Sequence, residues 1–292
     1  MLRSAFRATL VSAAIAIVAS SSGAQLRPGC SGFGSRLSLD FASAKAGTIA
    51  DVAGRGTGLL DRLTGTGTAL PVNDPNLALD TNAGLLRIRS TNSDLNGQLG
   101  LGTGEYLGAN LSRLGFTGSQ DFCVSTRLRD IRYSELFDQF GLYVGASGAS
   151  AFRAGHFATV TGRRLFSVST FNGSDVGLAD TPGPSEGSDL NLTIGRLGGA
   201  YFFDVNGFST ALGLQPTWLN GTGALNVGLF AANARNNNSK TMTVDEFTVA
   251  VNTTVVPEPS SLLLILSAGL ALLCWQSTGD RLRASRSGGS RD

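Results

Sequence analysis

The chain has little of the chemistry on which most enzymes and metalloproteins depend. Its 292 residues include one histidine, His156, and three cysteines that form neither a CxxC pair nor a Cys/His spacing suited to zinc. A Ser- or Cys-based triad cannot be assembled around this one histidine, and a lone histidine is most often a packed or surface residue. A basic stripe with interleaved aromatic residues is also absent. We therefore expect no catalytic residue, no metal site and no nucleic-acid partner.

Runs of strong helix formers are scarce as well. Glycine occurs 39 times, and threonine, asparagine and serine are frequent. This composition favours short strands joined by turns. Residues 25–254 are enough for one large all-β domain and too few for two, and they contain no internal repeat.

The N-terminus has the pattern of a secretory signal peptide. Arg3 and Arg7 precede an apolar core, and Ser22-Gly23-Ala24 supplies the small residues that favour cleavage. We predict a signal peptide over residues 1–24 and a mature chain that begins near Gln25. An uncleaved amphipathic helix is the alternative, and the small residues before Gln25 argue against it.

Residues 255–292 contain a second targeting pattern. Pro257-Glu258-Pro259 fixes an extended backbone ahead of an apolar segment, residues 262–275. This segment, which we predict to be a short transmembrane helix, has 14 residues, fewer than the ~20 that usually span a bilayer. The basic residues lie only after it, which places the tail in the cytoplasm and the preceding domain outside; they include Arg281, Arg283 and Arg286.

The order of these parts resembles the PEP-CTERM sorting tail, in which Pro257-Glu258-Pro259 stands at the signature tripeptide. The resemblance implies recognition by an exosortase, a membrane-embedded cysteine transpeptidase that would process the tail near the tripeptide. It also implies export through the inner membrane of a Gram-negative-type bacterium, transient anchoring in that membrane, and release to the cell surface or beyond. Here the arginines are more widely spread and the tail is longer than the family pattern. A plain C-terminal membrane anchor is the alternative.

Cysteine usage fits an exported domain. Cys30 and Cys123 would lie outside the cell, whereas Cys274 lies in the apolar C-terminal segment. Two cysteines in an exported chain favour one disulfide, Cys30–Cys123. Two buried free thiols are the alternative.

The region between the ends reads as a series of strands. Alternation of apolar and polar residues is clearest at residues 122–129 and 190–195, and Asn206-Gly207 supplies the positive-φ pair of a type I′ turn. Residues 51–76 and 181–187 read as loops, and residues 97–118 are hard to assign. Around a dozen strands and no long helix predict an antiparallel two-sheet β-sandwich; the other expected strands lie near residues 37–41, 85–90, 139–144, 151–159, 165–171, 201–205, 225–231 and 242–251.

One hairpin resembles a known fold family. Residues 192–207, Leu-Thr-Ile-Gly-Arg-Leu-Gly-Gly-Ala-Tyr-Phe-Phe-Asp-Val-Asn-Gly, look like the "L-x-I-x-R" strand and the aromatic strand ending in "V-N-G" of concanavalin A-like lectin/glucanase jelly rolls, including laminin-G-like domains. Residues 227–233 and 242–249 are similar to the last two strands of those domains. The resemblance implies a jelly roll with a concave sheet, which binds glycans in many relatives.

Catalysis is not expected from the carboxylates. Some relatives hydrolyse β-glucans with an E-x-D-x-x-E pair of glutamates, and this spacing is absent. Asp245 and Glu246 are adjacent, so in a strand their side chains point to opposite faces and cannot act as a pair. The sequence therefore predicts a protein that is not an enzyme.

Carbohydrate binding is the more probable function, because aromatic rings stack on sugars and nearby Asn or Asp residues bond their hydroxyls. The candidate ligand residues are Trp218, which follows Pro216 in a predicted loop, with Tyr201, Asp204 and Asn206; Tyr143, Phe157, Phe166 and Phe203 are further candidates for a sugar platform, although most aromatics must fill the core.

A calcium site at Asp204, Asn206 and Asp245, like those of some laminin-G-like relatives, is the one cofactor considered. No DxDxDG loop supports it, and turn chemistry alone explains Asn206. We expect an exported surface or matrix protein that binds exopolysaccharide. The alternatives are a structural or adhesive surface protein without a glycan ligand and, more distantly, a glycoside hydrolase.

Overall fold

The fold is taken from a computed structural model of the chain. The structure describes residues 30–46, 48–62, 73–92, 105–116, 118–132, 138–147, 150–233 and 240–252. The chain divides into two compact units, residues 1–252 and 253–292. The predicted signal peptide and sorting tail, with Pro257, Glu258, Pro259 and the three arginines, lie outside the described residues and stay predictions. None of the helices within the described ranges is long and apolar enough to cross a membrane.

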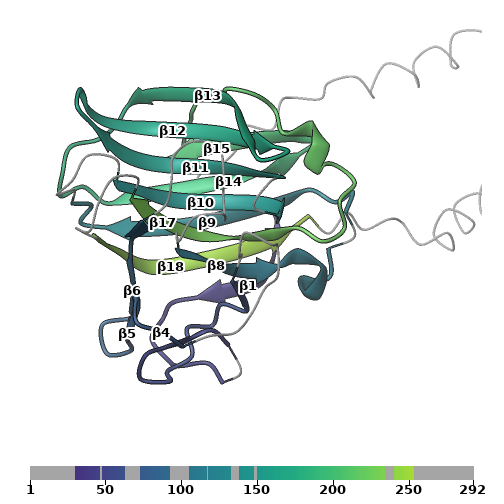
Figure 1. Ribbon diagram of the computed structural model, residues 1–292. Coiled ribbons are helices and arrows are strands. Elements are labelled where there is room, and N and C mark those ends of the chain that lie inside the picture. Colours follow the sequence, from purple (N-terminus) through teal and green to yellow (C-terminus); the bar gives the residue numbers. More distant parts are fainter. Residues whose placement is uncertain are drawn as a thin grey trace, which may run out of the picture. The chain divides into compact units, whose positions relative to one another are not determined.

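Residues 30–252 form two antiparallel sheets that lie against each other (Figure 1). We call the first the β9 sheet, after its central strand. Its order is β16 (Phe208–Ser209), β15 (Ala200–Val205), β14 (Leu190–Leu197), β9 (Phe122–Arg129), β18 (Thr241–Val251), β6 (Leu85–Arg89) and β5 (Leu77–Asp80), and β1 (Gly34–Leu39) also pairs with β18.

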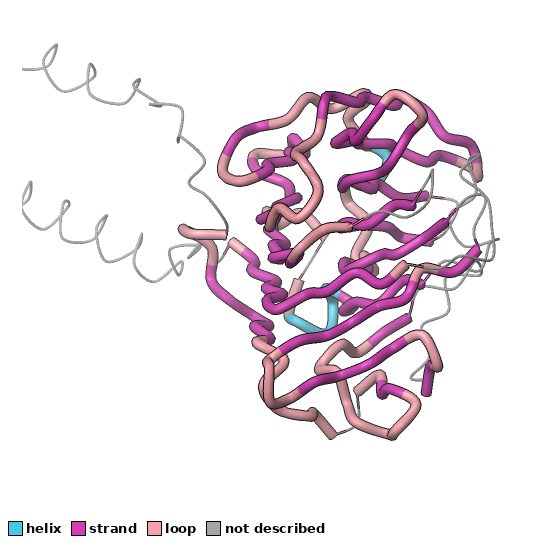
Figure 2. The backbone as a smooth tube through the Cα atoms, turned by 90° about the vertical axis from the view of Figure 1, so that its left-hand side faces the viewer, coloured by secondary structure: helices cyan, strands magenta, loops and turns pink. Residues whose placement is uncertain are grey.

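The second sheet, the β10 sheet, is equally broad. Its order is β13 (Ser174–Pro182), β12 (Gly162–Phe171), β11 (Ser150–Thr159), β10 (Asp138–Ser147), β17 (Asn226–Asn233), β8 (Glu105–Asn110) and β3 (Asp61–Arg62), and β7 (Thr91–Asn92) pairs in parallel with β17. A short parallel pair joins β2 (Ala50–Asp51) to β4 (Asn73–Asp74). In the described residues the helices are two short 3₁₀ segments, η1 (Leu111–Leu114) and η2 (Thr217–Leu219) (Figure 2).

The predicted all-β sandwich is confirmed, and its core follows from the alternation in the strands. Val124, Ile194 and Phe203 point inward from the β9 sheet, and Leu142 and Phe152 point inward from the β10 sheet. All five side chains are buried in one apolar cluster. Burial of a side chain of this size contributes about 1.5–3 kcal/mol, so this shared core holds the two sheets together.

Several loop predictions need correction. The segment predicted as a loop at residues 51–76 contains β3 and β4, and the region that was hard to assign contains β8 and η1. Strand β13, which alternation in the sequence does not reveal, extends into the loop predicted at residues 181–187. Trp218 lies in η2 and not in an irregular loop. Most of these elements are edge strands or short segments, and β8 lies one strand in from the edge, between β17 and β3. In such places tertiary pairing decides the conformation more than local pattern does.

A second apolar cluster lies on the opposite face of the β10 sheet. It contains Tyr106, Tyr143, Phe166 and Phe230, and the Tyr106 ring centroid is 5.5 Å from that of Tyr143 and 6.0 Å from that of Phe230. Beside these rings, Gly108 faces Gly228 and Gly141 faces Gly155 across neighbouring strands. A Cβ on any of the four would come within about 2.0–2.2 Å of a backbone oxygen of the adjacent strand. Only glycine allows the strands to approach so closely there.

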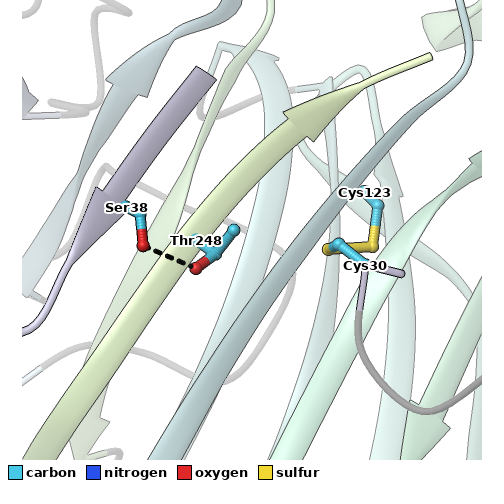
Figure 3. The surroundings of a disulfide bond; sticks show 4 residues. All are labelled: Cys30, Ser38, Cys123 and Thr248. Atoms are coloured by element: carbon cyan, nitrogen blue, oxygen red, sulfur yellow. Dashed lines mark hydrogen bonds between the residues drawn. A yellow bond between two sulfur atoms is a disulfide. The ribbon is translucent and has the colours of Figure 1, made fainter. Parts of the chain in front are cut away.

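A disulfide joins Cys30 to Cys123, with the two Cα atoms 5.5 Å apart (Figure 3). Cys123 lies in β9 on the outer face of its sheet, in register with Gly195 and Ala250. On the same face, the hydroxyls of Ser38 in β1 and Thr248 in β18 are 3.4 Å apart. The bridge therefore ties the segment that leads into β1 to the middle of the β9 sheet.

His156 is buried in β11 with 1% of its surface exposed. Burial, and to a smaller extent the positive charge of Arg163, lowers the pKa of His156 to about 3, from about 6.5 in the unfolded chain. Between these two values the unfolded chain binds more protons than the folded one, so stability falls as the pH falls.

We expect the free energy of unfolding to decrease by about 2 kcal/mol between pH 7 and pH 5, a range above the ordinary titration of carboxylates. Urea unfolding at the two pH values measures this change. In His156→Gln the difference between the two pH values should be nearly abolished, whatever the variant's stability at pH 7. A wild-type protein that is equally stable at both pH values would contradict the prediction.

Candidate functional site

The structure does not bring the four predicted ligand residues together. Tyr201 points into the core, with 3% of its surface exposed, and packs against Phe122 and Phe152. The centroid of the Trp218 ring lies 5.0 Å from that of the Phe171 ring, and its buried indole nitrogen has no hydrogen-bond partner among the described residues. Asp204 and Asn206 instead lie on the outer face of the β9 sheet and in the turn after β15. Tyr201 and Trp218 therefore form no platform with the two polar residues.

Asp204 and Asn206 are held by local hydrogen bonds. Ser209 Oγ donates to Asp204 Oδ1 at 2.7 Å. The backbone N of Asn191 donates to Asn206 Oδ1 at 2.9 Å, and the N of Asn206 donates back to the Asn191 carbonyl at 2.8 Å. Asn206 and Gly207 both have positive φ, as a type I′ turn requires. The turn thus fixes Asn206 beside the first residues of β14.

A polar pocket of about 230 Å³ opens beside this turn on the β9 sheet. Its outward-facing side chains come from three adjacent strands, because Ser125 of β9 pairs with Thr193 of β14 and Glu246 of β18 pairs with the neighbouring Arg127. The lining residues are Ser125, Thr126, Asn191, Leu192, Thr193, Asn206, Gly207 and Glu246. The pocket therefore presents hydroxyls, amides and one carboxylate.

The arrangement of Asp245 and Glu246 corrects a prediction. A β-bulge between Val244 and Glu246 shifts the register of β18 against β9, so that both acidic residues lie opposite Arg127. A bulge sets two residues of one strand against one residue of its partner. The two carboxylates consequently share the outer face of the β9 sheet and do not point to opposite faces.

The two carboxylates have different partners. Arg127 Nε donates to both carboxylate oxygens of Asp245 at 2.8 and 2.9 Å, and a second guanidinium nitrogen lies 2.7 Å from Oδ2. The hydrogen bond that Arg127 donates to Asp245 raises the pKa of Arg127. Arg129 lies 3.4 Å from the same carboxylate. The backbone carbonyl of Glu246 accepts a hydrogen bond from Thr126 Oγ1 at 2.7 Å. Within the part of the chain that the structure describes, the Glu246 carboxylate forms no hydrogen bond or ion pair, so this exposed group is available to a ligand.

The aromatic residues proposed from the sequence as a sugar platform are placed elsewhere. Tyr143 and Phe166 belong to the buried cluster on the outer face of the β10 sheet, and Phe157 packs against it. Tyr143 is fully buried, its hydroxyl has no hydrogen-bond partner in the described part of the chain, and burial raises its pKa. Phe203, the remaining candidate, lies in the core. These rings stabilise the fold and do not form an open surface.

The described residues contain no group of three His, Cys, Asp or Glu side chains placed to hold a metal ion. Asp245 forms ion pairs with Arg127 and Arg129. Asp204 and Asn206 accept hydrogen bonds from Ser209 Oγ and from the backbone N of Asn191. These contacts do not test calcium binding at Asp204, Asn206 and Asp245, which stays a prediction.

No protein-family model matches the chain. No curated protein matches it either. Solved structures share the sandwich. A mutant of the GH43 protein BlXynB from Bacillus licheniformis is 16% identical with a TM-score of 0.52, over 74% of this chain and 39% of that one. A Bacteroides ovatus protein named xyloglucan PUL GH43B is 16% identical with a TM-score of 0.50, over 73% and 38%. A xylan β-1,4-xylosidase from Bacillus halodurans is 15% identical with a TM-score of 0.50, over 73% and 38%.

These matches overturn the prediction that the protein is not an enzyme. The fold occurs in chains of glycoside hydrolases, and the missing E-x-D-x-x-E spacing excludes one arrangement of carboxylates only. At 15–16% identity the likeness shows the fold alone. This chain also spans 38–39% of each matched chain, so the activity of the whole protein is not carried over.

Some of the pocket residues that were not predicted from the sequence could have been recognised there, and others could not. Asn191 and Thr193 alternate with Leu190 and Leu192, so their place on a polar face was readable. Glu246 was not readable as a pocket residue, because its direction depends on the bulge.

Proposed function

We propose that this protein is an exported cell-surface or matrix protein whose concanavalin A-like sandwich binds carbohydrate through the polar pocket of the β9 sheet. The pocket carries the proposal. Ser125, Thr193, Asn191 and Asn206 supply hydroxyl and amide groups that can both donate to and accept from sugar hydroxyls. The sandwich shared with chains of carbohydrate-active enzymes supports the same reading by analogy of fold.

Export and sorting are a separate part of the proposal and rest on the sequence alone. The signal peptide over residues 1–24 would deliver the domain across the membrane. An exosortase would then read Pro257-Glu258-Pro259, the apolar segment 262–275 and the distal arginines as one signal. The mass of the C-terminal peptide from surface-released protein tests this part. A peptide that still contains residues 262–292 would show that the tail is not processed and would favour a plain membrane anchor.

Binding is tested by applying the purified exported protein to an array of neutral, amino and acidic polysaccharides. We expect saturable binding to at least one class. Asn191→Ala should weaken it by about fivefold or more, which is the loss of one hydrogen bond worth about 1 kcal/mol. Thr241→Ala, exposed on the same strand as Glu246, is the matched control and should bind as wild type.

Two other results would overturn the proposal in different ways. Absence of binding to every class of polymer would favour the structural or adhesive alternative. Release of reducing sugar from a bound polymer identifies a hydrolase, and loss of that release in Glu246→Gln would assign Glu246 to the chemistry.

A further inference from the structure

We propose that the pocket of the β9 sheet selects a sugar unit with a free amino group, and that Glu246 is the ion-pair partner of its ammonium. The inference rests on the proposed carbohydrate function and adds the class of sugar. It is argued from the charge of the pocket, its size and its hydrogen-bonding groups.

Charge is the first observation. Glu246 is the one ionisable residue among the eight that line the pocket. Arg127, which lies opposite it in the register, is held by Asp245 through contacts of 2.7–2.9 Å, and Arg129 adds a second cation to Asp245. Asp245 thus holds Arg127, and Asp189 holds Arg129 at 3.0 Å. Among the described residues no cation forms an ion pair with the Glu246 carboxylate, and Arg127 acts on it only through its charge.

This distribution discriminates between sugars. A uronate placed in the pocket would set its carboxylate against that of Glu246, and the two like charges repel, more strongly where water is excluded. An ammonium group in the same place gains a charge-assisted hydrogen bond. A neutral sugar gains neither effect. The expected order of affinity is therefore amino sugar, then neutral sugar, then uronate.

Size and lining fit one sugar unit. The pocket of about 230 Å³ is smaller than the ~300–1,000 Å³ typical of sites for drug-sized ligands. None of its eight described lining residues is aromatic, so recognition by these residues depends on hydrogen bonds and charge rather than on stacking. Asn206 Oδ1 is occupied by the Asn191 backbone N, which leaves the Asn206 amide NH₂ as a donor. With Ser125 and Thr193 this provides groups for the ring hydroxyls around the amine.

The test compares three probes of equal length by calorimetry on the exported protein: glucosamine oligomers, their N-acetylated forms, and uronate oligomers. We expect the glucosamine oligomers to bind best and the uronates least. Glu246→Gln should weaken binding of the amine form by about fivefold, the size of a solvent-exposed ion pair, and leave the N-acetylated form unchanged. High salt should have the same effect on wild type. Glu186→Gln, an exposed glutamate paired with Arg163 in another part of the domain, is the control.

The outcomes separate the inference from the function on which it rests. If wild type binds neutral oligomers as well as the amine form, and Glu246→Gln changes neither, the amino-sugar inference is wrong and carbohydrate binding stands. If uronates bind best, the inference is also wrong. If no oligomer or polymer of any class binds, the proposed function fails together with it.

Discussion

Opening the Cys30–Cys123 disulfide is expected to lower the free energy of unfolding by on the order of 4–5 kcal/mol. The bridge closes a loop between residues 93 apart in the sequence, and a loop of this length restricts the unfolded chain by about that amount. In the folded chain the bridge joins Cys30 to β9, which pairs with both β14 and β18.

The measurement is urea unfolding of the oxidised protein, of the reduced protein and of Cys30→Ser. The single variant is informative because Cys30 is only half-buried, whereas Cys123 is fully buried in its sheet. Loss of the bridge predicts a similar decrease for the reduced protein and for Cys30→Ser. A Cys30→Ser protein as stable as wild type would show that the bridge adds nothing. Free alkylation of both thiols in the unreduced, denatured protein would show that it does not form.

Replacing Arg196 is expected to cost roughly 3–4 kcal/mol, because it is a buried cation held by neutral groups. It is 2% exposed, and its guanidinium donates to the carbonyl oxygens of Gly118 and Gln120 and to Asn220 Oδ1. It also lies 5.4 Å from the Phe116 ring centroid and 5.6 Å from that of Phe122. Arg196→Met keeps much of the apolar volume but removes the donor from the carbonyl oxygens of Gly118 and Gln120, at about 1–3 kcal/mol for each buried group. The exposed Asn220 can bond water instead.

Chemical denaturation of Arg196→Met, Arg196→Lys and Arg132→Met measures the effect. Arg132 is the control, since its side chain is 70% exposed and its ion pair with Asp130 is at the surface, where such pairs contribute about 0–1 kcal/mol. Lysine keeps the charge but not the planar fork that reaches several acceptors, so Arg196→Lys should fall between wild type and Arg196→Met. Equal stability of the two methionine variants would contradict this account of Arg196.

The resemblance in the sequence at residues 192–207 included Arg196 as part of a strand pattern but gave no reason for its presence. The structure supplies one. Arg196 connects β14 to the segment before β9 through Gly118 and Gln120, and to the end of η2 through Asn220. A pattern within one strand cannot show which carbonyl groups another segment will bring to it.

Local pattern determined the class of fold and the strongest elements. Alternation in residues 122–129 and 190–195 follows from the two-residue period of a strand with one buried face, and Asn206-Gly207 follows from its backbone preference. These properties belong to short stretches of sequence and survive in the folded chain. Cysteine count and compartment likewise indicated the Cys30–Cys123 pair.

Tertiary structure decided where side chains from different strands meet. It buried Tyr201 in the core, and it placed Tyr143 and Phe166 in a closed cluster. It also placed Asp245 and Glu246 on one face. A bulge is a choice of register between two strands, and register depends on the partner strand and not on the order of residues in one of them. For this reason the sequence alone determined an all-β sandwich, whereas the free carboxylate in the pocket came from the pairing of β18 with β9.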